Sequence, residues 1–453
     1  MHTTLLKAKH VVVLGLGISG LSAAQFLLNR NAKVVGVDRN PDLPLTNSTV
    51  ASLCERGMIF SPEQQPLDIS QFDLLVVSPG INPTHPLYQQ AEKHGIEIMG
   101  EVELACREMT KTCLGITGTN GKTTVTLLIT HILQQAGIKA QALGNIGLPL
   151  TSALDIPEWQ AADVLVVELS SFQLETLTAR CLDTAVILNI TPDHLDRYPS
   201  LEAYALAKLN IRRNLKKKGV LFIEDKCLKE FGHLLPSSDS PHSYGYSPSD
   251  QIHTDTQMIY HHGIPAFELP SSLQGKRSHD IENIMAAYAL CHSLGISNEV
   301  FVRALASFQK PSHRIEFVKT ISGIHYYDDS KGTNIDAVIR AVEGFKSNVI
   351  LIAGGVDKGF PYTPWITAFR NRVSAVYAIG QSKEKIAQDL AAHLPVTLCK
   401  DLEEAVQRAT CVAKAGDNIL LSPGCSSFDM FKDYAHRGQE FQRIVNALKE
   451  NIK

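Results

Sequence analysis

A glycine-rich stretch in the first third of the chain carries residue types that bind nucleotide phosphates. It consists of Gly118, Thr119, Asn120, Gly121, Lys122, Thr123 and Thr124. The apolar run before it, 112–117, predicts a buried strand, and the run after it, 125–129, predicts a helix. Glycines let backbone N–H groups close around an anion, and the helix adds its positive N-terminal end. With Lys122 as a point charge and Thr123 as a hydroxyl for a metal ion, the stretch predicts binding of ATP with magnesium.

One position departs from the general phosphate-loop pattern. The pattern places a glycine six residues before the lysine, and Ile116 stands there. We therefore expect a tighter loop than that of motor and signalling NTPases. A glycine-lysine-threonine triplet alone is weak evidence, and an ordinary strand-to-helix turn is the alternative. The order of strand, loop and helix favours the phosphate site.

A second glycine pattern, near the start of the chain, has the form of a dinucleotide-binding fingerprint. It reads Gly15, Leu16, Gly17, Ile18, Ser19, Gly20 after an apolar strand, and Asp38 ends the next strand. Taken alone, the pattern predicts NAD. Because nothing downstream supplies a hydride site, the pyrophosphate of a nucleotide-sugar is an equal candidate, with Asp38 on its uridine part. A glycine turn that only packs a helix on a strand is the alternative without a ligand.

Polar residues follow two further apolar strands. Glu168 ends the run 164–168, where a second magnesium anchor belongs beside a phosphate loop. A surface glutamate is the alternative, and the wholly apolar strand before it disfavours that. His194 follows the strand 184–189 and becomes a ligand candidate only through this position. Taken alone, Lys208 would be interpreted as a lysine on the exposed surface of a helix.

Composition limits the classes of function. The 453 residues predict about three domains, and a formal net charge of −3 without a basic block argues against nucleic-acid or membrane-surface binding. Arg212, Arg213 and 216–218 are expected at the solvated end of a helix. Nine scattered cysteines predict free, mostly buried thiols in a reducing compartment. No apolar segment approaches the roughly 18 residues that span a bilayer, so we expect a cytoplasmic protein without membrane insertion.

Alternating strands and helices predict the fold class. The pattern predicts an α/β protein with an N-terminal Rossmann-like parallel sheet, a central P-loop α/β domain and a C-terminal Rossmann-like α/β domain. The expected boundaries are 1–100, 101–309 and 310–453, with a hinge at 310–314. Between about 234 and 270 the chain is rich in Ser, Pro, His and Gly, and we expect a loop-rich or antiparallel edge of the second domain there.

The order of motifs along the chain resembles the Mur ligases of peptidoglycan synthesis. The motifs are GTNGKT, ELSSFQ, NITPDHLDRY, AKLNI, HRIE, DDSKGTN and SPGCSSFDMFKDYAHRG. The resemblance covers essentially the whole chain. The phosphate loop is common to the family, whereas the closing motif, 422–438, resembles the D-glutamate-adding branch more specifically.

The resemblance implies a set of ATP and metal contacts. Thr123 and Glu168 would hold one magnesium ion, and His194 with a carbamylated Lys208 would hold a second, since a carbamate turns the lysine into an oxygen donor. The implied ATP contacts are the phosphate loop, Asn283, Arg314 and Asp329. The implied catalytic residues are Lys122, Glu168, His194, Lys208 and Lys331.

The resemblance also implies the substrates and their contacts. It implies that UDP-MurNAc-L-alanine binds the first domain, ATP the second, and the incoming D-glutamate the third, in a monomer. The implied substrate contacts are Gly17, Ile18, Ser19, Asp38, Arg39, Ser78, Gly80, Asn82, Asn145, Gln173, Thr333, Lys358, Ser427 and Tyr434. Asp280 stands where the family often has asparagine and is left out, and Tyr434 stands where phenylalanine is also found.

The implied reaction is ATP-driven amide-bond formation. The substrate carboxylate attacks the γ-phosphate to give an acyl phosphate, and the D-glutamate amine then displaces phosphate. Two magnesium ions and Lys122 would offset the repulsion between the two anions. The alternatives are another Mur ligase, a folylpolyglutamate synthetase-like ligase, which the complete first glycine pattern disfavours, and an NAD-dependent dehydrogenase, which Lys122 disfavours.

Overall fold

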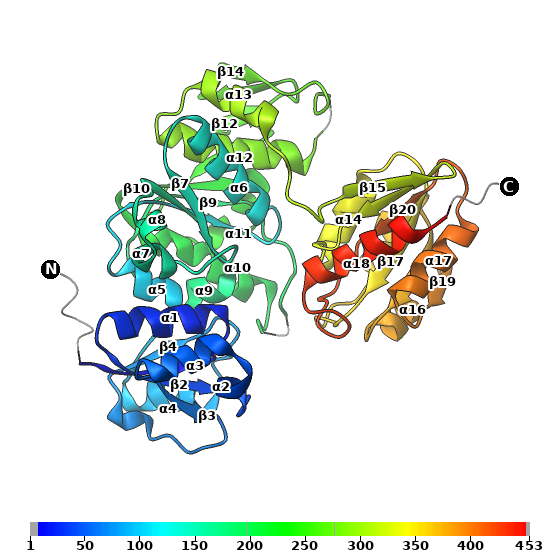
Figure 1. The fold of residues 1–453 in the computed structure, drawn as a ribbon. Coiled ribbons are helices and arrows are strands. Elements are labelled where there is room, and N and C mark those ends of the chain that lie inside the picture. Colours follow the sequence, from blue (N-terminus) through cyan, green and yellow to red (C-terminus); the bar gives the residue numbers. More distant parts are fainter. Residues whose placement is uncertain (1–7, 196, 276, 450–453) are drawn as a thin grey trace. The chain divides into compact units, whose positions relative to one another are not determined.

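A computed structural model describes residues 8–195, 197–275 and 277–449. Its contacts divide the chain into two compact units. The first comprises the chain up to Ile190 together with Ala205–Phe308, and the second comprises Thr191–Tyr204 together with the chain from Gln309 onward. Figure 1 shows two sheets in the first unit and one sheet in the second. The predicted α/β fold class is confirmed.

The N-terminal sheet is wholly parallel. Its strands run in the order β3-β2-β1-β4-β5. They are β1 (His10–Leu14), β2 (Lys33–Asp38), β3 (Ile59–Pro62), β4 (Leu74–Val77) and β5 (Glu97–Gly100). The helices between them are α1 (Ile18–Asn29), α2 (Leu43–Thr46), α3 (Ser48–Glu55) and α4 (Pro86–His94), with α5 (Glu101–Cys106) following β5. Parallel strands require crossover helices, so the alternation read in the sequence corresponds to this sheet.

The central sheet of the first unit has nine strands in the order β14-β13-β12-β11-β10-β9-β6-β8-β7. They are β6 (Thr112–Thr117), β7 (Ala140–Gly144), β8 (Val164–Glu168), β9 (Leu182–Ile187), β10 (Leu215–Glu224), β11 (His242–Gly245), β12 (Ile252–Thr254), β13 (Met258–His261) and β14 (Ile264–Glu268). Strands β6 to β12 pair in parallel, and only β12, β13 and β14 pair in antiparallel fashion. The expected antiparallel edge is therefore confirmed for its outer part alone.

Helices α6 (Lys122–Gln135), α12 (His279–Ser293) and α13 (Asn298–Ser307) share one hydrophobic core with this sheet. Shorter helices are α7 (Ser152–Asp155), α8 (Pro157–Gln160), α9 (Ser171–Glu175), α10 (Leu201–Leu209) and α11 (Asp225–Phe231). The expectation for the basic residues is wrong. Arg212 and Arg213 lie in a 3-10 turn, Asn210–Asn214, and 216–218 belong to β10, because a long strand continues there in place of a helix end.

The second unit carries a six-stranded sheet in the order β15-β16-β20-β17-β18-β19. Its strands are β15 (Glu316–Ile321), β16 (Ile324–Asp328), β17 (Val349–Gly354), β18 (Val373–Ile379), β19 (Val396–Leu398) and β20 (Asn418–Leu421). Among the described strands of this sheet, β15 and β16 pair in antiparallel fashion and the other neighbours pair in parallel. The helices are α14 (Ile335–Glu343), α15 (Pro364–Phe369), α16 (Lys383–Leu390), α17 (Leu402–Val412) and α18 (Tyr434–Ala447).

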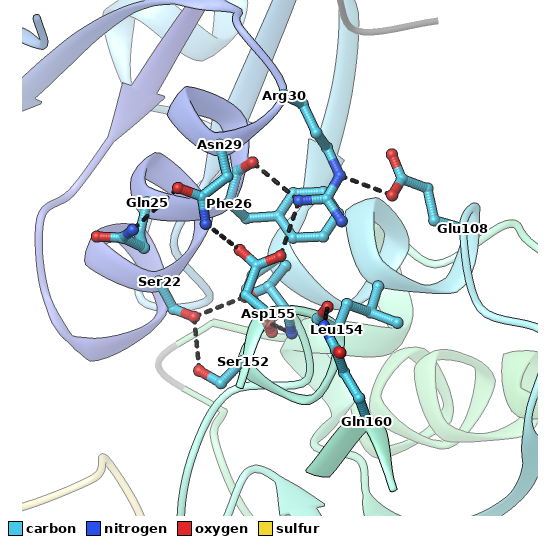
Figure 2. Close-up of polar contacts among 12 residues, drawn as sticks. Ser22, Gln25, Phe26, Asn29, Arg30, Glu108, Ser152, Leu154, Asp155 and Gln160 are labelled. Atoms are coloured by element: carbon cyan, nitrogen blue, oxygen red, sulfur yellow. Dashed lines mark hydrogen bonds and ion pairs between the residues drawn. The ribbon is translucent and has the colours of Figure 1, made fainter. Parts of the chain in front are cut away.

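Within the first unit, polar contacts join α1 to the segment around α7 (Figure 2). The Arg30 guanidinium donates to Glu108 Oε2 at 2.6 Å and to Asp155 Oδ1 at 3.0 Å, and it stacks on the Phe26 ring. The Asn29 amide donates to the other oxygen of Asp155 at 2.7 Å. Because α1 begins directly after the first glycine loop, these contacts fix the direction of that loop's helix.

Glu101 is fully buried at the start of α5, also within the first unit. Its Oε1 accepts hydrogen bonds from the Thr151 hydroxyl at 2.7 Å and the Thr151 backbone N–H at 2.5 Å. Burial raises the pKa of Glu101 to about 7, against the hydrogen bonds from Thr151, which lower it. This carboxyl therefore changes its charge near neutral pH.

All nine cysteines are described and free, and only Cys411 on α17 is exposed. Seven of them are buried and Cys54 is partly buried, which confirms the expected set of mostly buried thiols.

Candidate active site

The phosphate loop is held in shape by its own side chains and by Asn189. Gly118 and Gly121 both have positive φ, and a Cβ at Gly118 would lie 2.9 Å from the Cβ of Leu188. Asn189 accepts the N–H of Asn120 at 2.8 Å and returns a hydrogen bond to its carbonyl at 3.0 Å. Lys122, the first residue of α6, donates to the carbonyls of Gly118 and Thr119, each at 2.9 Å. Asn189 was not predicted as a site residue, although its position at a strand end in the NITPDH motif could have indicated it.

Lys208 lies on the same loop. Its side chain is buried, and its Nζ donates to Gly118 O at 2.8 Å. Two lysine side chains, 122 and 208, thus share one carbonyl oxygen. The interpretation of Lys208 as a surface lysine, reached from the residue alone, is wrong, because α10 turns this face toward the loop. Both side chains therefore lie at the phosphate loop, where a bound phosphate or its metal ion would be.

Glu168 ends β8 beside the phosphate loop, since it pairs with Ile116 of β6 in the sheet register. It is 2% exposed, and its Oε1 accepts a hydrogen bond from Asn145 Nδ2 at 2.8 Å. Its Oε2 is buried and accepts no hydrogen bond within the described part of the chain. A buried carboxylate oxygen without a donor is costly unless a cation binds it. Glu168 therefore fits a magnesium ligand, with Asn145 orienting it.

The neighbouring predicted residues have local roles. Asn283 on α12 contacts the phosphate loop, since a Cβ at Gly121 would lie 2.6 Å from its Oδ1. Gln173 is buried and caps α9, accepting the Ser170 N–H at 2.9 Å. Thr123 is half-buried and Thr124 buried in the first turn of α6. Asp280 lies in the first turn of α12, where a carboxylate stabilises the helix dipole.

The first glycine loop is held by a carboxylate. Asp38 accepts the Leu16 N–H at 2.8 Å and the Asn40 N–H at 3.0 Å. The Ser78 hydroxyl donates to Gly15 O at 2.7 Å, and a Cβ on Gly20 would overlap that same carbonyl.

The rim of this loop is open. A Cβ on Gly17 or Gly80 would meet nothing within 4 Å. Ile18 is 73% exposed, Ser19 is half-buried and Arg39 is exposed. Asn82 stabilises its own turn by accepting the N–H and the hydroxyl of Thr84, each at 2.9 Å. The predicted nucleotide-sugar contacts on this rim stay a prediction.

In the second unit, Asp329 and Lys331 lie on the turn after β16. Asp329 accepts the Ser422 hydroxyl at 2.7 Å, and burial raises its pKa to about 7, while the Arg314 charge acts in the opposite direction. The ammonium of Lys331 lies 3.7 Å from the centre of the Tyr434 ring. The turn thus combines a titrating carboxyl with a cation held over an aromatic face.

The sequence reading missed a buried arginine below this turn. Arg437 donates to Ser330 O at 2.9 Å and to Cys425 O at 3.2 Å. It thereby joins two of the recognised motifs, and burial lowers its pKa to about 10. Its place in the DYAHRG motif was visible, but the sequence did not reveal its burial.

Lys358 and His194 both lie near Asp193. The Lys358 ammonium pairs with Asp193 Oδ1 at 3.1 Å, and Asn334 donates to Asp193 Oδ2 at 3.5 Å. His194 has positive φ, and its Nε2 lies 3.6 Å from Asp193 Oδ2. Asp193 was missed as a site residue, although it stands beside His194 in the sequence.

The remaining predicted residues also fall in the second unit. Thr333 is half-buried next to Asn334, and Ser427 is buried, with its carbonyl accepting the N–H of Phe431 at 2.9 Å. His194 belongs to the second unit and Lys208 to the first. The metal position that they were expected to share therefore stays a prediction.

Three family models match consecutive parts of the chain. The Mur ligase MurD-like N-terminal domain matches 9–100, the Mur ligase middle domain 116–291 and the Mur ligase glutamate ligase domain 313–425. The chain belongs to the Mur ligase family. Mur ligases use ATP and Mg²⁺, and the unpartnered oxygen of Glu168 beside the phosphate loop fits that requirement.

Full-length relatives agree with this assignment. The UDP-N-acetylmuramoylalanine--D-glutamate ligase of Protochlamydia amoebophila is 51% identical over 442 residues, which cover 97% of this chain and 98% of the relative. The enzyme of the same name from Chlamydia caviae is 36% identical over 450 residues, 98% of this chain and 99% of the relative.

Solved structures of more distant Mur ligases share the fold. The UDP-N-acetylmuramate-alanine ligase MurC of Thermotoga maritima is 17% identical with a TM-score of 0.59, covering 97% of this chain and 100% of its own. MurF ligase of Thermotoga maritima in complex with ADP is 15% identical with a TM-score of 0.59, covering 98% and 97%. In the described ranges no helix is both long and apolar enough to span a membrane.

Proposed function

We propose that the protein is an ATP-dependent ligase that adds D-glutamate to UDP-N-acetylmuramoyl-L-alanine in peptidoglycan precursor synthesis. The carrying observation is the 51% identity to a ligase of that name over 97% of the chain. The closing motif with its buried Arg437 and the phosphate loop with its two lysines support the same reaction.

In this proposal the first unit activates the substrate carboxylate. Lys122 leaves the carbonyls of its own loop to face the phosphates, and the N–H groups at the start of α6 line the same site. Glu168, oriented by Asn145, and the Thr123 hydroxyl would hold magnesium. The ion supplies charge neutralisation between the attacking carboxylate and the γ-phosphate. The product of this step is an acyl phosphate.

The second unit would present D-glutamate to the acyl phosphate. Lys358, Thr333 and Ser427 offer a cation and hydroxyl donors for its two carboxylates. Lys331, held over the Tyr434 ring, would neutralise the reacting carboxylate. Asp193, which now pairs with Lys358, offers an acceptor for the incoming ammonium group. Transfer of a proton from the ammonium group to the Asp193 carboxylate would free the amine to attack the carbonyl carbon of the acyl phosphate. Inorganic phosphate would then leave.

The proposal includes finer points. Residues 1–100 bind the nucleotide-sugar, 101–309 bind ATP and 310–453 bind the acceptor. A second magnesium ion is held by His194 and a carbamylated Lys208, and the enzyme is a cytoplasmic monomer. The buried position of Lys208 against Gly118 supports the lysine's role at the loop.

The carbamate is tested by Lys208→Ala, which should lose turnover and regain part of it when formate is added. Full activity of this variant without formate would refute the carbamate.

ADP release with UDP-MurNAc-L-alanine and single candidate amino acids tests the function directly. D-Glutamate should support release, whereas L-alanine, L-lysine and diaminopimelate should not, because a site built from hydrogen-bonding groups penalises a ligand that leaves them unpaired. NAD(H) should not bind. Faster incorporation of L-lysine would overturn the acceptor while leaving the ligase class intact, and NAD(H) binding lost in Asp38→Ala would support the dehydrogenase alternative.

A further inference from the structure

Helix α5 connects the two sheets of the first unit and is buried along its whole length. It follows β5 of the N-terminal sheet directly and precedes β6 of the central sheet. All six of its residues, Glu101–Cys106, are buried, and two of them are glutamates. Taking a carboxylate out of water costs free energy unless hydrogen bonds or ions compensate it. The partners of these two glutamates therefore show which segments the helix holds in place.

The two glutamates bind different segments of the chain. Glu103 accepts hydrogen bonds from the backbone N–H groups of Thr178 and Ala179, at 2.7 and 2.8 Å, and from the Thr178 hydroxyl at 3.0 Å. Glu101 instead binds the hydroxyl and the backbone N–H of Thr151, which is fully buried. Glu103 thus fixes the segment before β9, and Glu101 fixes the segment before α7.

Thr151 also connects Glu101 to α1, the helix that the first glycine loop opens. The Ser22 hydroxyl of α1 lies 2.7 Å from the Thr151 hydroxyl and 2.9 Å from the Ser152 hydroxyl (Figure 2). Because the Thr151 hydroxyl donates its one proton to Glu101, it accepts the proton of Ser22, and Ser22 accepts that of Ser152. A directed chain of hydrogen bonds therefore runs from α7 through α1 to the Glu101 carboxyl.

The segment 144–151, which we call the bridging segment, leads from β7 to Thr151 and is also held near its start. The backbone N–H of Asn145 donates to Glu168 O at 2.9 Å, and the Asn145 side chain donates to Glu168 Oε1 at 2.8 Å. Between these two anchors the segment turns outward, and Leu148 is 43% exposed. The bridging segment is thus an exposed turn fixed by Glu168 at one end and by Glu101 at the other.

We propose that Glu101 is a positioning residue that presents the bridging segment to the substrate. The inference rests on the proposed function, in which a nucleotide-sugar extends from the first glycine loop to the phosphate loop. By holding Thr151, which contacts Ser22 of α1, Glu101 fixes Asn145 relative to the first glycine loop. A substrate that reaches both places then meets a turn that is already ordered, so little binding free energy is spent on ordering it. Glu101 itself is buried and acts through Thr151.

Thr151→Val tests this role, because it removes the hydroxyl and preserves the shape of the side chain. Thr178→Val is the matched control, since it removes a hydroxyl donor to Glu103 on the same helix and leaves the bridging segment unchanged. Hydrogen exchange of the ligand-free full-length protein, followed by mass spectrometry, reports local opening. Exchange in the bridging segment should be faster in Thr151→Val and unchanged in Thr178→Val, whereas the melting temperature should fall by a similar amount in both.

Kinetic constants separate positioning from stability. In Thr151→Val, the Michaelis constant for UDP-MurNAc-L-alanine and the magnesium concentration for half-maximal rate should rise roughly three- to tenfold, the effect of one lost hydrogen bond. Binding must then order the segment, so the cost appears in these constants and leaves kcat and the constant for D-glutamate unchanged. Glu101→Gln keeps an acceptor oxygen for Thr151 and should retain the wild-type constants.

The outcomes separate this proposal from the proposed function. Faster exchange together with the selective rise in these constants supports the positioning role. Wild-type exchange of the bridging segment in folded Thr151→Val overturns it, and so does faster exchange with unchanged constants. If Thr151→Val does not fold, Ser22→Ala, which removes the contact with α1, decides by the same measurements. Failure of the wild type to release ADP with D-glutamate would refute the proposed function itself.

Discussion

The two glycine loops of the first unit share a topology but are held by opposite charges. Each follows a parallel strand and opens a helix, α1 in one case and α6 in the other. In the first loop the Asp38 carboxylate accepts a backbone N–H, whereas in the phosphate loop the Lys122 ammonium donates to two carbonyls. A carboxylate opposes a phosphate and favours hydroxyl or N–H groups, while a lysine can turn from carbonyl to phosphate. The two loops have similar glycines, so the charge of the side chain that holds each loop, Asp38 or Lys122, is the better indicator of the group that the loop binds.

The largest effect is expected at Lys122. Lys122→Ala should lower turnover by about 10²-fold or more, because it removes a charge aimed at the γ-phosphate, and it should leave nucleotide-sugar affinity unchanged. Steady-state kinetics and equilibrium titration measure the two quantities. Lys217→Ala, an exposed lysine on β10, is the control. Near-normal turnover of Lys122→Ala would show that the Lys122 charge does not act on the γ-phosphate.

Glu168 should come next. Glu168→Gln retains the shape of the side chain but removes the charge that leaves Oε2 in need of a cation. Turnover should fall by roughly 10²-fold, and the magnesium concentration for half-maximal rate should rise. A magnesium titration of ADP release measures both. An unchanged magnesium dependence would show that another residue is the protein's metal ligand.

Glu101, which joins α5 to Thr151 in the first unit, should make the stability of the protein depend on pH. Its folded pKa of about 7 exceeds the ordinary value of 4.5, so the folded state holds the proton more tightly. Stability is therefore full below pH 4.5 and decreases as pH rises through 7, by up to about 3 kcal/mol. In Glu101→Gln the melting temperature should depend less on pH across this window. An unaltered slope would assign the pH response elsewhere.

Asp38 should show a smaller and more selective effect. Asp38→Ala removes the acceptor of the Leu16 N–H, and we expect the Michaelis constant for the nucleotide-sugar to rise by about tenfold, the value of one charged hydrogen bond. The constant for ATP should not change. Asp42→Ala, a nearby carboxylate, is the control. A change in both constants would mean that the two loops are coupled.

The smallest effect is expected at the contact between α1 and Asp155. A double-mutant cycle with Arg30→Ala and Asp155→Asn should give a coupling energy of about 1 kcal/mol in stability, since both side chains are mostly buried. Thermal unfolding in low and high salt measures it. A coupling near zero would mean that packing, rather than this ion pair, orients the helix of the first loop.

The elements that build the sheets could be predicted because parallel strands covered on both faces are continuous apolar runs. Thr112–Thr117 and Val164–Glu168 were predicted correctly for this reason. Short strands such as Glu97–Gly100 were missed, because four residues carry little periodicity. The antiparallel pair β15 and β16 was missed as well, because β15 is exposed or partly buried over most of its length and is not a continuous apolar run.

For the candidate site, residue types and spacing predicted the glycine loops and Glu168, whose positions follow from strand ends. Residues held by distant partners could not be predicted. Lys208 contacts Gly118 across 90 positions and Arg437 contacts Ser330 across 107, and no local pattern encodes either contact. The burial of such polar side chains depends on the completed fold.

The distribution of thiols offers a route to measuring domain motion. Thiolates react with maleimides only where reagent reaches them, and burial raises the pKa of the Cys54 thiol, the next most accessible one. A fluorophore would therefore couple first to Cys411 on α17, without any engineered change in the second unit. With one further label placed on the first unit, energy transfer between the two dyes would follow the separation of the units as ATP, nucleotide-sugar and D-glutamate are added in turn.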